Sequence, residues 1–188
     1  MSEKTKLGAK GFLYPMPIVL IGADVDGRAN FTTIAYCAIV QKKPAMIAVS
    51  LYKEHHTCKG IRKNKTFSVN IPSEKLVVQT DHCGLVSGKN TDKSKVFKVF
   101  YGKLKTAPMI FECPINLECA LVKTVKLDEE DLFVGLIKES YAEDRFLTNG
   151  VPDIKKIRPL VYATKTSSYF SIGRFVAKAY EIGKKYKK

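Results

Sequence analysis

The chain has 188 residues, of which 45% are hydrophobic and 27% are charged. This composition is close to the average of globular proteins, which excludes a disordered or fibrous chain, and the length suits one domain over residues 1–188. No apolar run reaches the ~18 residues that a membrane-spanning helix needs, and no signal-peptide pattern follows the N-terminal lysines. We therefore expect a single cytoplasmic domain that does not bind membranes.

Basic residues outnumber acidic residues by 32 to 18, which gives a formal net charge of +14. Such an excess indicates an anionic partner of some kind. Two segments concentrate the charge: residues 53–65, where His55, His56 and Thr57 add groups that can donate to phosphate, and residues 174–188. The second segment is also typical of a solvated helix end, because cations complement the helix dipole there.

The five cysteines form no CxxC pair, and their odd number argues against a disulfide framework. Cys37 and Cys119 lie in apolar stretches and are expected to be buried thiols of a reduced, intracellular protein. The histidines and their neighbouring cysteines match no standard zinc spacing, so we predict no metal site. Whether any cysteine is redox-active stays open.

Apolar strands separated by short turns dominate the first part of the chain. The sequence predicts strands at residues 18–22, 29–34, 35–40 and 45–51, with turns at residues 26–27 and 42–44. Residues 57–64 lack strand alternation and predict a short helix. Residues 67–71 alternate again and stop at Pro72, after which Ser73 is the expected N-cap of a helix that ends near Asp81.

The second half of the chain continues this pattern. Residues 83–95 predict a loop, and alternation over 115–121 and 132–136, on either side of an acidic turn, predicts a long antiparallel hairpin. After a strand at 160–163, apolar residues at helical spacing predict a C-terminal amphipathic helix. They are Ile172, Phe175, Val176, Ala179 and Ile182. Many strands with short turns and few helices favour a barrel.

The signature motifs of several enzyme classes are missing. The sequence has no GxGxxG after a strand, no P-loop, no GxSxG, no HExxH and no EF-hand loop. No Ser or Cys is paired with His and Asp in a recognisable order, so no catalytic residue is predicted. An enzyme with this sequence would rely on a bound cofactor for its chemistry.

Short motifs nevertheless occur in an order that resembles the flavin-reductase-like family of FMN-binding split barrels, flavoredoxin type. They lie at residues 14–22, 26–35, 43–50, 55–57 with Ile61, 66–72, 87–93 (a serine-glycine loop ending in Asp-Lys), 108–119, 134–135, 159–162 and 169–173. The resemblance covers nearly the whole chain. It implies a mainly β (α+β) fold, an antiparallel split β-barrel with short helices and a C-terminal helix. It also implies a homodimer that holds one FMN per subunit near the interface.

The resemblance further implies which segments bind FMN. The isoalloxazine would lie against residues 30–35, where backbone amides and threonine hydroxyls can meet its polar edge, and the phosphate against residues 50–57. The lysines of the 87–93 loop and Tyr169 are weaker candidates. The predicted set is Asn30, Phe31, Thr32, Thr33, Ile34, Ala35, Ser50, Leu51, Lys53, His56, Thr57, Lys89, Lys93 and Tyr169.

Each group in this set has a structural alternative when the residues are considered alone. Adjacent threonines are common β-formers, and a basic loop can simply be solvated. The lysines of the 87–93 loop can face solvent, and Tyr169 can belong to the core. The choice between His55 and His56 as the phosphate ligand stays open, because the doubled histidine blurs the register.

The function implied is that of an FMN-dependent oxidoreductase, which takes electrons from NAD(P)H or a redox protein and passes them to a small or protein acceptor. One alternative is a reductase that uses free flavin as a substrate. Another, from a different class, is a basic nucleic-acid-binding β-barrel, which the charge and the nineteen Phe and Tyr residues favour. The aromatic residues are scattered, however, and form no RNP1-like run, so we expect no nucleic-acid partner.

Overall fold

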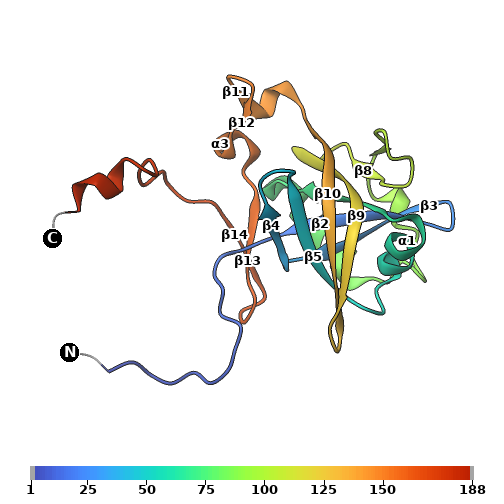
Figure 1. Cartoon of the computed structure of the whole chain (residues 1–188), viewed down its shortest axis with the longest axis horizontal. Helices are drawn as coiled ribbons and strands as arrows, with labels where there is room; N and C mark the ends of the chain where they lie inside the picture. Colours follow the sequence, from blue (N-terminus) through green and yellow to red (C-terminus); the bar gives the residue numbers. More distant parts are fainter. Residues whose placement is uncertain (1–2, 187–188) are drawn as a thin grey trace.

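The computed structural model describes residues 3–186 and is built around a seven-stranded antiparallel sheet (Figure 1). The strand order is β3-β2-β6-β9-β10-β5-β4. These strands are β2 (Val19–Val25), β3 (Arg28–Ile34), β4 (Cys37–Gln41), β5 (Met46–Tyr52), β6 (Thr66–Ile71), β9 (Ile115–Lys126) and β10 (Glu130–Ala142). Within the described chain no pairing joins the edge strands β3 and β4, so the barrel stays split.

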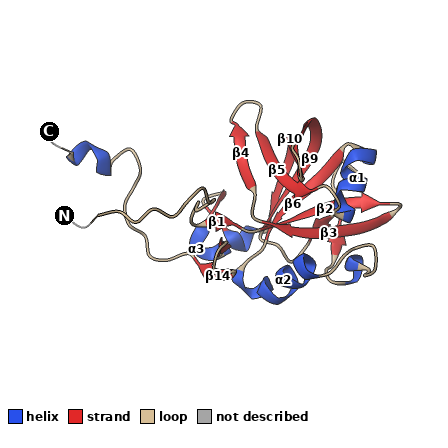
Figure 2. Ribbon diagram, turned by 90° about the horizontal axis from the view of Figure 1, so that it is seen from below, coloured by secondary structure: helices blue, strands red, loops and turns tan. Residues whose placement is uncertain are grey.

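Smaller elements surround this sheet (Figure 2). The helices are α1 (His56–Asn64), α2 (Val77–Leu85) and α3 (Ile154–Ile157), and the 3-10 turns are η1 (Glu74–Leu76), η2 (Lys93–Lys95), η3 (Asp144–Phe146) and η4 (Ile182–Lys185). A second sheet joins β1 (Met16–Pro17), β13 (Leu160–Ala163) and β14 (Ser168–Ser171), and β7 (Val99–Phe100) pairs with β8 (Met109–Ile110), as β11 (Leu147–Thr148) does with β12 (Val151–Pro152). None of the helices between residues 3 and 186 has the length and apolar character needed to cross a membrane.

Two hydrophobic clusters make up the core, and β2 contributes to both. Ile21 packs in one cluster with Phe67 and Phe133, whereas the adjacent Leu20 packs in the other with Phe31. Successive side chains of a strand point to opposite faces, so β2 is covered on both sides. This double burial explains why residues 18–23 are a continuous apolar run rather than an alternating one.

Most of the predicted elements are confirmed. The four N-terminal strands, the helix at residues 56–64, the strand that ends before Pro72 and the long β9–β10 hairpin all form. The second helix extends further than predicted, to Leu85, and the loop begins only after it. Ser73 occupies the predicted N-cap position, just before η1 and its continuation into α2, but its side chain makes no capping hydrogen bond.

The predicted C-terminal amphipathic helix is wrong. Residues 172–178 have no regular structure, and only η4 forms near the end of the tail, which runs away from the sheet (Figure 1). An amphipathic helix is stabilised by packing of its apolar face. That face has no support here, because Phe175 is 65% exposed and Val176 is 87% exposed. The last two lysines of the basic segment, Lys187 and Lys188, lie outside the described residues.

Candidate functional site

Two adjoining cavities of about 220 Å³ each lie where β3, the beginning of α1 and the loop after α2 meet. Asn30, His56, Gly88 and Lys93 line both of them. The first cavity is further lined by Val25, Asp26, Arg28, Ala29, Lys89 and Thr91, and the second by Thr32, Glu54, His55, Thr57, Gly84, Leu85, Val86 and Ser87. Segments that the sequence predicted separately therefore converge at one place.

The strand β3 and the helix α1 are tied together at the base of these cavities. The Nδ2 amide of Asn30 donates a hydrogen bond of 2.7 Å to the Oγ1 of Thr57, and both side chains are buried. Alternation along β3 directs Asn30 and Thr32 to the same side of the sheet. Because Thr57 is the second residue of α1, the cavities adjoin the helix N-terminus, where unpaired amides and the helix dipole favour an anion.

Gly88 brings the loop after α2 into close contact with this base. A Cβ atom at Gly88 would collide with Oδ1 of Asn30, and would lie 2.8 Å from its Cγ and 3.0 Å from Cδ2 of His56. Asn30 cannot move aside freely, since its amide is bound to Thr57. The sequence analysis missed Gly88 as a site residue, and its place beside Ser87 in the serine-glycine motif was the available signal.

Lys93 is the most unusual residue of the site, because it is a lysine with only 3% exposure. Its Nζ donates a hydrogen bond of 2.8 Å to the carbonyl oxygen of Cys83, and no carboxylate of the described chain forms an ion pair with it. Burial lowers the pKa of this ammonium group. A buried cation without a counterion is unfavourable, so the position suits an anionic ligand.

The two adjacent histidines occupy different positions. His56 lines both cavities, whereas His55 lines only the second and keeps a buried Nδ1 atom that has no hydrogen-bond partner within residues 3–186. Burial lowers the pKa of both imidazoles; the charge of Lys59 adds to this effect at His56. Burial therefore favours the neutral form of both rings, in which each can donate one N–H.

Three residues of the predicted phosphate segment do not line these cavities. Lys53 donates from Nζ to the carbonyl oxygen of Asp128 at 2.7 Å, and Ser50 donates from Oγ to Glu130 at 3.2 Å. Asp128 belongs to the β9–β10 turn, and Glu130 is the first residue of β10. Leu51 is fully buried in the core. Contact of these three residues with a cofactor stays a prediction.

The predicted ring-binding segment is likewise divided. Phe31 and Ile34 are buried in the two core clusters, and the Thr33 hydroxyl donates to the carbonyl oxygen of Thr80 in α2. Ala35 follows the strand and is half-buried. Of the predicted ring residues, only Asn30 and Thr32 line the cavities.

Tyr169 lies apart from the two cavities, against α2. Its hydroxyl donates to Oδ1 of Asp81 at 2.7 Å, and burial together with this carboxylate raises the pKa of the phenol. Tyr169 and Leu85 line a shallow apolar depression, and Leu85 also borders the second cavity. Tyr169 therefore stands next to the site without lining it.

The cysteines near the site are poor candidates for redox chemistry. Burial raises the pKa of Cys58 to about 12 and that of Cys83 to about 11, so the reactive thiolate is disfavoured in both. All five cysteines are free thiols. No group of three or more His, Cys, Asp or Glu side chains within residues 3–186 is arranged to hold a metal ion.

Several known proteins are similar to this chain in sequence and in fold. Residues 11–171 match the family described as flavin reductase like domain. Flavoredoxin from Methanosarcina acetivorans is 45% identical, with a TM-score of 0.95 over 97% of this chain and 98% of that one. Flavoredoxin of Desulfovibrio vulgaris (Miyazaki F) is 34% identical, with a TM-score of 0.90 over 96% and 100%. An uncharacterised protein of Aeropyrum pernix is 29% identical over 82% of this chain, which spans 59% of that relative's length. The chain therefore belongs to the flavin-reductase-like family and has the split-barrel fold of the flavoredoxins.

Proposed function

We propose that this protein is an FMN-binding oxidoreductase of the flavoredoxin type, which takes electrons from NAD(P)H or a redox protein and delivers them to a small or protein acceptor. The observation that carries the proposal is Lys93. A buried ammonium group that meets only a carbonyl oxygen among residues 3–186, on the wall shared by two polar cavities, has the chemistry needed for a phosphate.

The other residues of the cavities fit the same ligand. His56 can donate an N–H, and the amides that open α1 add further donors, so a dianion would meet several hydrogen-bond partners. Asn30 and Thr57 satisfy each other, which fixes the base of the site before any ligand arrives. Such preorganisation reduces the cost of ordering the site upon binding.

The edge strand β3 offers the groups that a flavin ring requires. No other strand of the described chain pairs with the outer edge of β3, so backbone donors and acceptors remain available beside Asn30 and Thr32. A ring with a polar edge needs such alternating groups. When bound, FMN would supply the redox chemistry, and the residues of the chain would hold its phosphate, orient its ring and limit the access of water.

We further propose that the chain, a single domain, forms a homodimer in the cytoplasm. The tail exposes apolar side chains that a second subunit can cover: Phe175 is 65% exposed, Val176 is 87% exposed and Tyr180 is 95% exposed. The five free thiols support a reducing compartment. Light scattering tests the dimer. It should give twice the mass of the chain, and removal of residues 172–188 should lower the measured mass toward that of the monomer. A monomeric mass for the full-length chain would contradict the dimer.

The visible spectrum of the purified protein tests the cofactor, and anaerobic titration with NADH and NADPH tests the electron donor. We expect a flavin spectrum that is restored by FMN after its removal, and bleaching by a nicotinamide or a reduced redox protein. Absence of saturable FMN binding would refute the proposal. Flavin that leaves the protein in every turnover would instead indicate a reductase of free flavin.

A further inference from the structure

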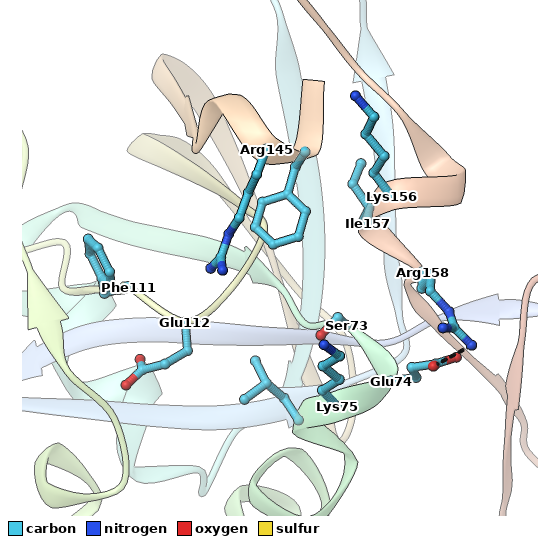
Figure 3. A pocket seen from close by; sticks show the side chains of 11 residues that line it. Ser73, Glu74, Lys75, Phe111, Glu112, Arg145, Lys156, Ile157 and Arg158 are labelled. Carbon is cyan, nitrogen blue, oxygen red and sulfur yellow. Dashed lines mark ion pairs between the residues drawn. The ribbon is translucent and has the colours of Figure 1, made fainter. Parts of the chain in front are cut away.

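A third cavity, larger than those at β3, lies between η1, η3 and α3 (Figure 3). Its volume is about 590 Å³, within the range of small-molecule sites in proteins. Its lining comes from four separate segments: residues 73–76, residues 111–112, residues 145–146 and residues 156–158. No residue of this lining borders the two cavities at β3.

The helix α2 separates this cavity from the proposed flavin site. Residues 73–76, which line the cavity, directly precede α2, whereas Gly84 and Leu85 at its other end line the second β3 cavity. Nine helical residues rise by about 13 Å. The cavity is therefore a distinct place in the molecule, and what it binds does not depend on the proposed function.

The walls of the cavity are largely apolar and include two aromatic rings. Phe146 comes from η3 and Phe111 follows β8, while Leu76 and Ile157 add aliphatic surface. Phe111 is 45% exposed, and the Nζ of Lys98 lies 4.6 Å from the centroid of its ring. Aromatic walls of this kind favour a flat ring as the occupant.

Two cations point into the cavity from opposite sides. Arg145 extends from η3, and its guanidinium lies over the Phe146 ring, 4.7 Å from the centroid, while Lys75 extends from η1 (Figure 3). Lys75 forms no ion pair or side-chain hydrogen bond with residues 3–186. Arg145 has one carboxylate partner, Glu143, at 2.6 Å outside the lining, which leaves part of its planar fork available.

The remaining charged groups of the lining are directed elsewhere. Glu74 is bound to Arg158 at 2.6 Å, and Glu112 accepts the backbone N–H of Lys98 at 3.0 Å. Lys156 donates to the carbonyl oxygen of Leu147. Four cations and two carboxylates belong to the lining, so the cavity keeps an excess of positive charge, and this excess favours an anionic occupant.

We propose that this cavity binds a small aromatic carboxylate, with the ring between the phenylalanine side chains and the carboxylate on Arg145 and Lys75. The C-terminal tail of a second copy is a weaker match, although it is apolar. Residues 174–186 contain four basic residues and one acidic residue, so the tail has the same sign of charge as the cavity.

The proposal can be tested by calorimetric titration of the full-length, FMN-loaded protein with 2-naphthoate. We expect saturable binding with a Kd below about 1 mM, and at least tenfold weaker binding of neutral 2-naphthamide. Arg145→Gln and Lys75→Gln should each weaken 2-naphthoate binding about tenfold, as expected for the loss of one charge-assisted hydrogen bond. The flavin spectrum should not change during the titration, because the cavity is separate from the β3 site.

Matched variants keep the test decisive. Lys103→Gln removes an exposed cation that does not line the cavity and should leave the affinity unchanged. Arg145→Lys keeps the charge but not the planar fork, so its affinity should lie between those of wild type and Arg145→Gln, and circular dichroism confirms folding. No saturable binding, equal affinity for the amide, or full affinity in both Gln variants would overturn the proposal.

Discussion

Two neighbouring groups of polar residues, both within the predicted cofactor site, differ in how their hydrogen bonds are used. Asn30, Thr57 and Lys93 are buried and line cavities, and Lys93 has no counterion in the described chain. Ser50, in β5, is bound to Glu130 at the start of β10, and Lys53, which follows β5, is bound to Asp128 in the β9–β10 turn. We call the first group the cavity side and the second group the turn side. Residues 50–57 form one polar segment in the sequence, but the structure divides it just before α1 into a structural part and a part that faces the cavities.

The pKa of His55 is influenced by charged residues on both sides. The charge of Glu130, on the turn side, raises its pKa, and the charge of Lys93, on the cavity side, lowers it, while burial lowers it most. The difference between the two lysines is therefore one of burial and place. Each donates to a carbonyl oxygen and neither forms an ion pair in the described chain, but Lys93 is buried and lines the cavities, whereas Lys53 is half-buried and does not.

The largest expected effect is the difference between two lysine-to-methionine variants, one at Lys93 and one at Lys53. Lys93→Met should weaken FMN binding about tenfold to hundredfold, because it removes a charge-assisted hydrogen bond worth about 1.5–3 kcal/mol. Lys53→Met should change the affinity less than about twofold. Flavin fluorescence titrations with FMN and with riboflavin provide the measurement, and riboflavin affinity should hardly change in either variant. Equal losses for the two lysines would remove the distinction between the two sides.

A second expected effect concerns the close approach at Gly88. Gly88→Ala should weaken FMN binding about tenfold, because the added Cβ collides with Asn30 and forces the 87–93 loop away from the cavities. Gly11→Ala is the matched control, since no atom lies within 4 Å of the Cβ it would introduce. Calorimetric titration with FMN measures both variants. An unchanged affinity in Gly88→Ala would mean that the loop does not shape the site.

A smaller effect is expected from single hydroxyl groups. Thr57→Val keeps the side-chain shape but leaves the Asn30 amide without its acceptor, and should weaken FMN binding about fivefold, as for one neutral hydrogen bond of about 1 kcal/mol. Ser50→Ala removes a hydroxyl that serves the turn and should leave FMN affinity unchanged while slightly lowering the urea midpoint. The reverse pattern would place the phosphate on the turn side.

The smallest effect is a pH dependence of stability due to His55. Its pKa is lowered in the folded chain, so the folded state favours the neutral ring, and this contribution is fully present above the unfolded pKa of about 6.5. It is lost as the pH falls through the lowered value. Without flavin, the free energy of unfolding should therefore decrease below about pH 6.5, and His55→Gln should reduce that decrease by less than about 1 kcal/mol. Urea denaturation between about pH 7.5 and 5.5 measures it, and identical slopes would contradict the role of His55.

The sequence alone predicted the strands well because their residues pack within the same chain. The alternation of β9 and β10 and the apolar run of β2 report burial directly. The C-terminal tail has an equally clear helical pattern, but Phe175 and Val176 of its apolar face stay exposed in the described part of the chain. Hydrophobic periodicity indicates that a segment has an apolar face, but it does not indicate what that face packs against.

Only part of the candidate site could be predicted, because motif order shows neither long-range contacts nor burial. Motif order located the 30–35, 50–57 and 87–93 segments, and Asn30, Thr32, His56, Thr57, Lys89 and Lys93 do line the cavities. It could not show that Lys53 is bound to the turn, because that contact joins residues 75 positions apart. Nor could it show that Lys93, among many lysines, is the buried one.

The central claim is that a buried lysine on the cavity side holds the phosphate of FMN, and the 31P NMR signal of bound FMN tests it most directly. Free phosphate monoesters gain their second proton near pH 6. Beside Lys93 the dianion is favoured, so the bound signal should keep its position from about pH 8 to well below pH 6, and Lys93→Met should restore the ordinary titration. A bound phosphate that titrates near pH 6 in the unaltered protein would contradict the account.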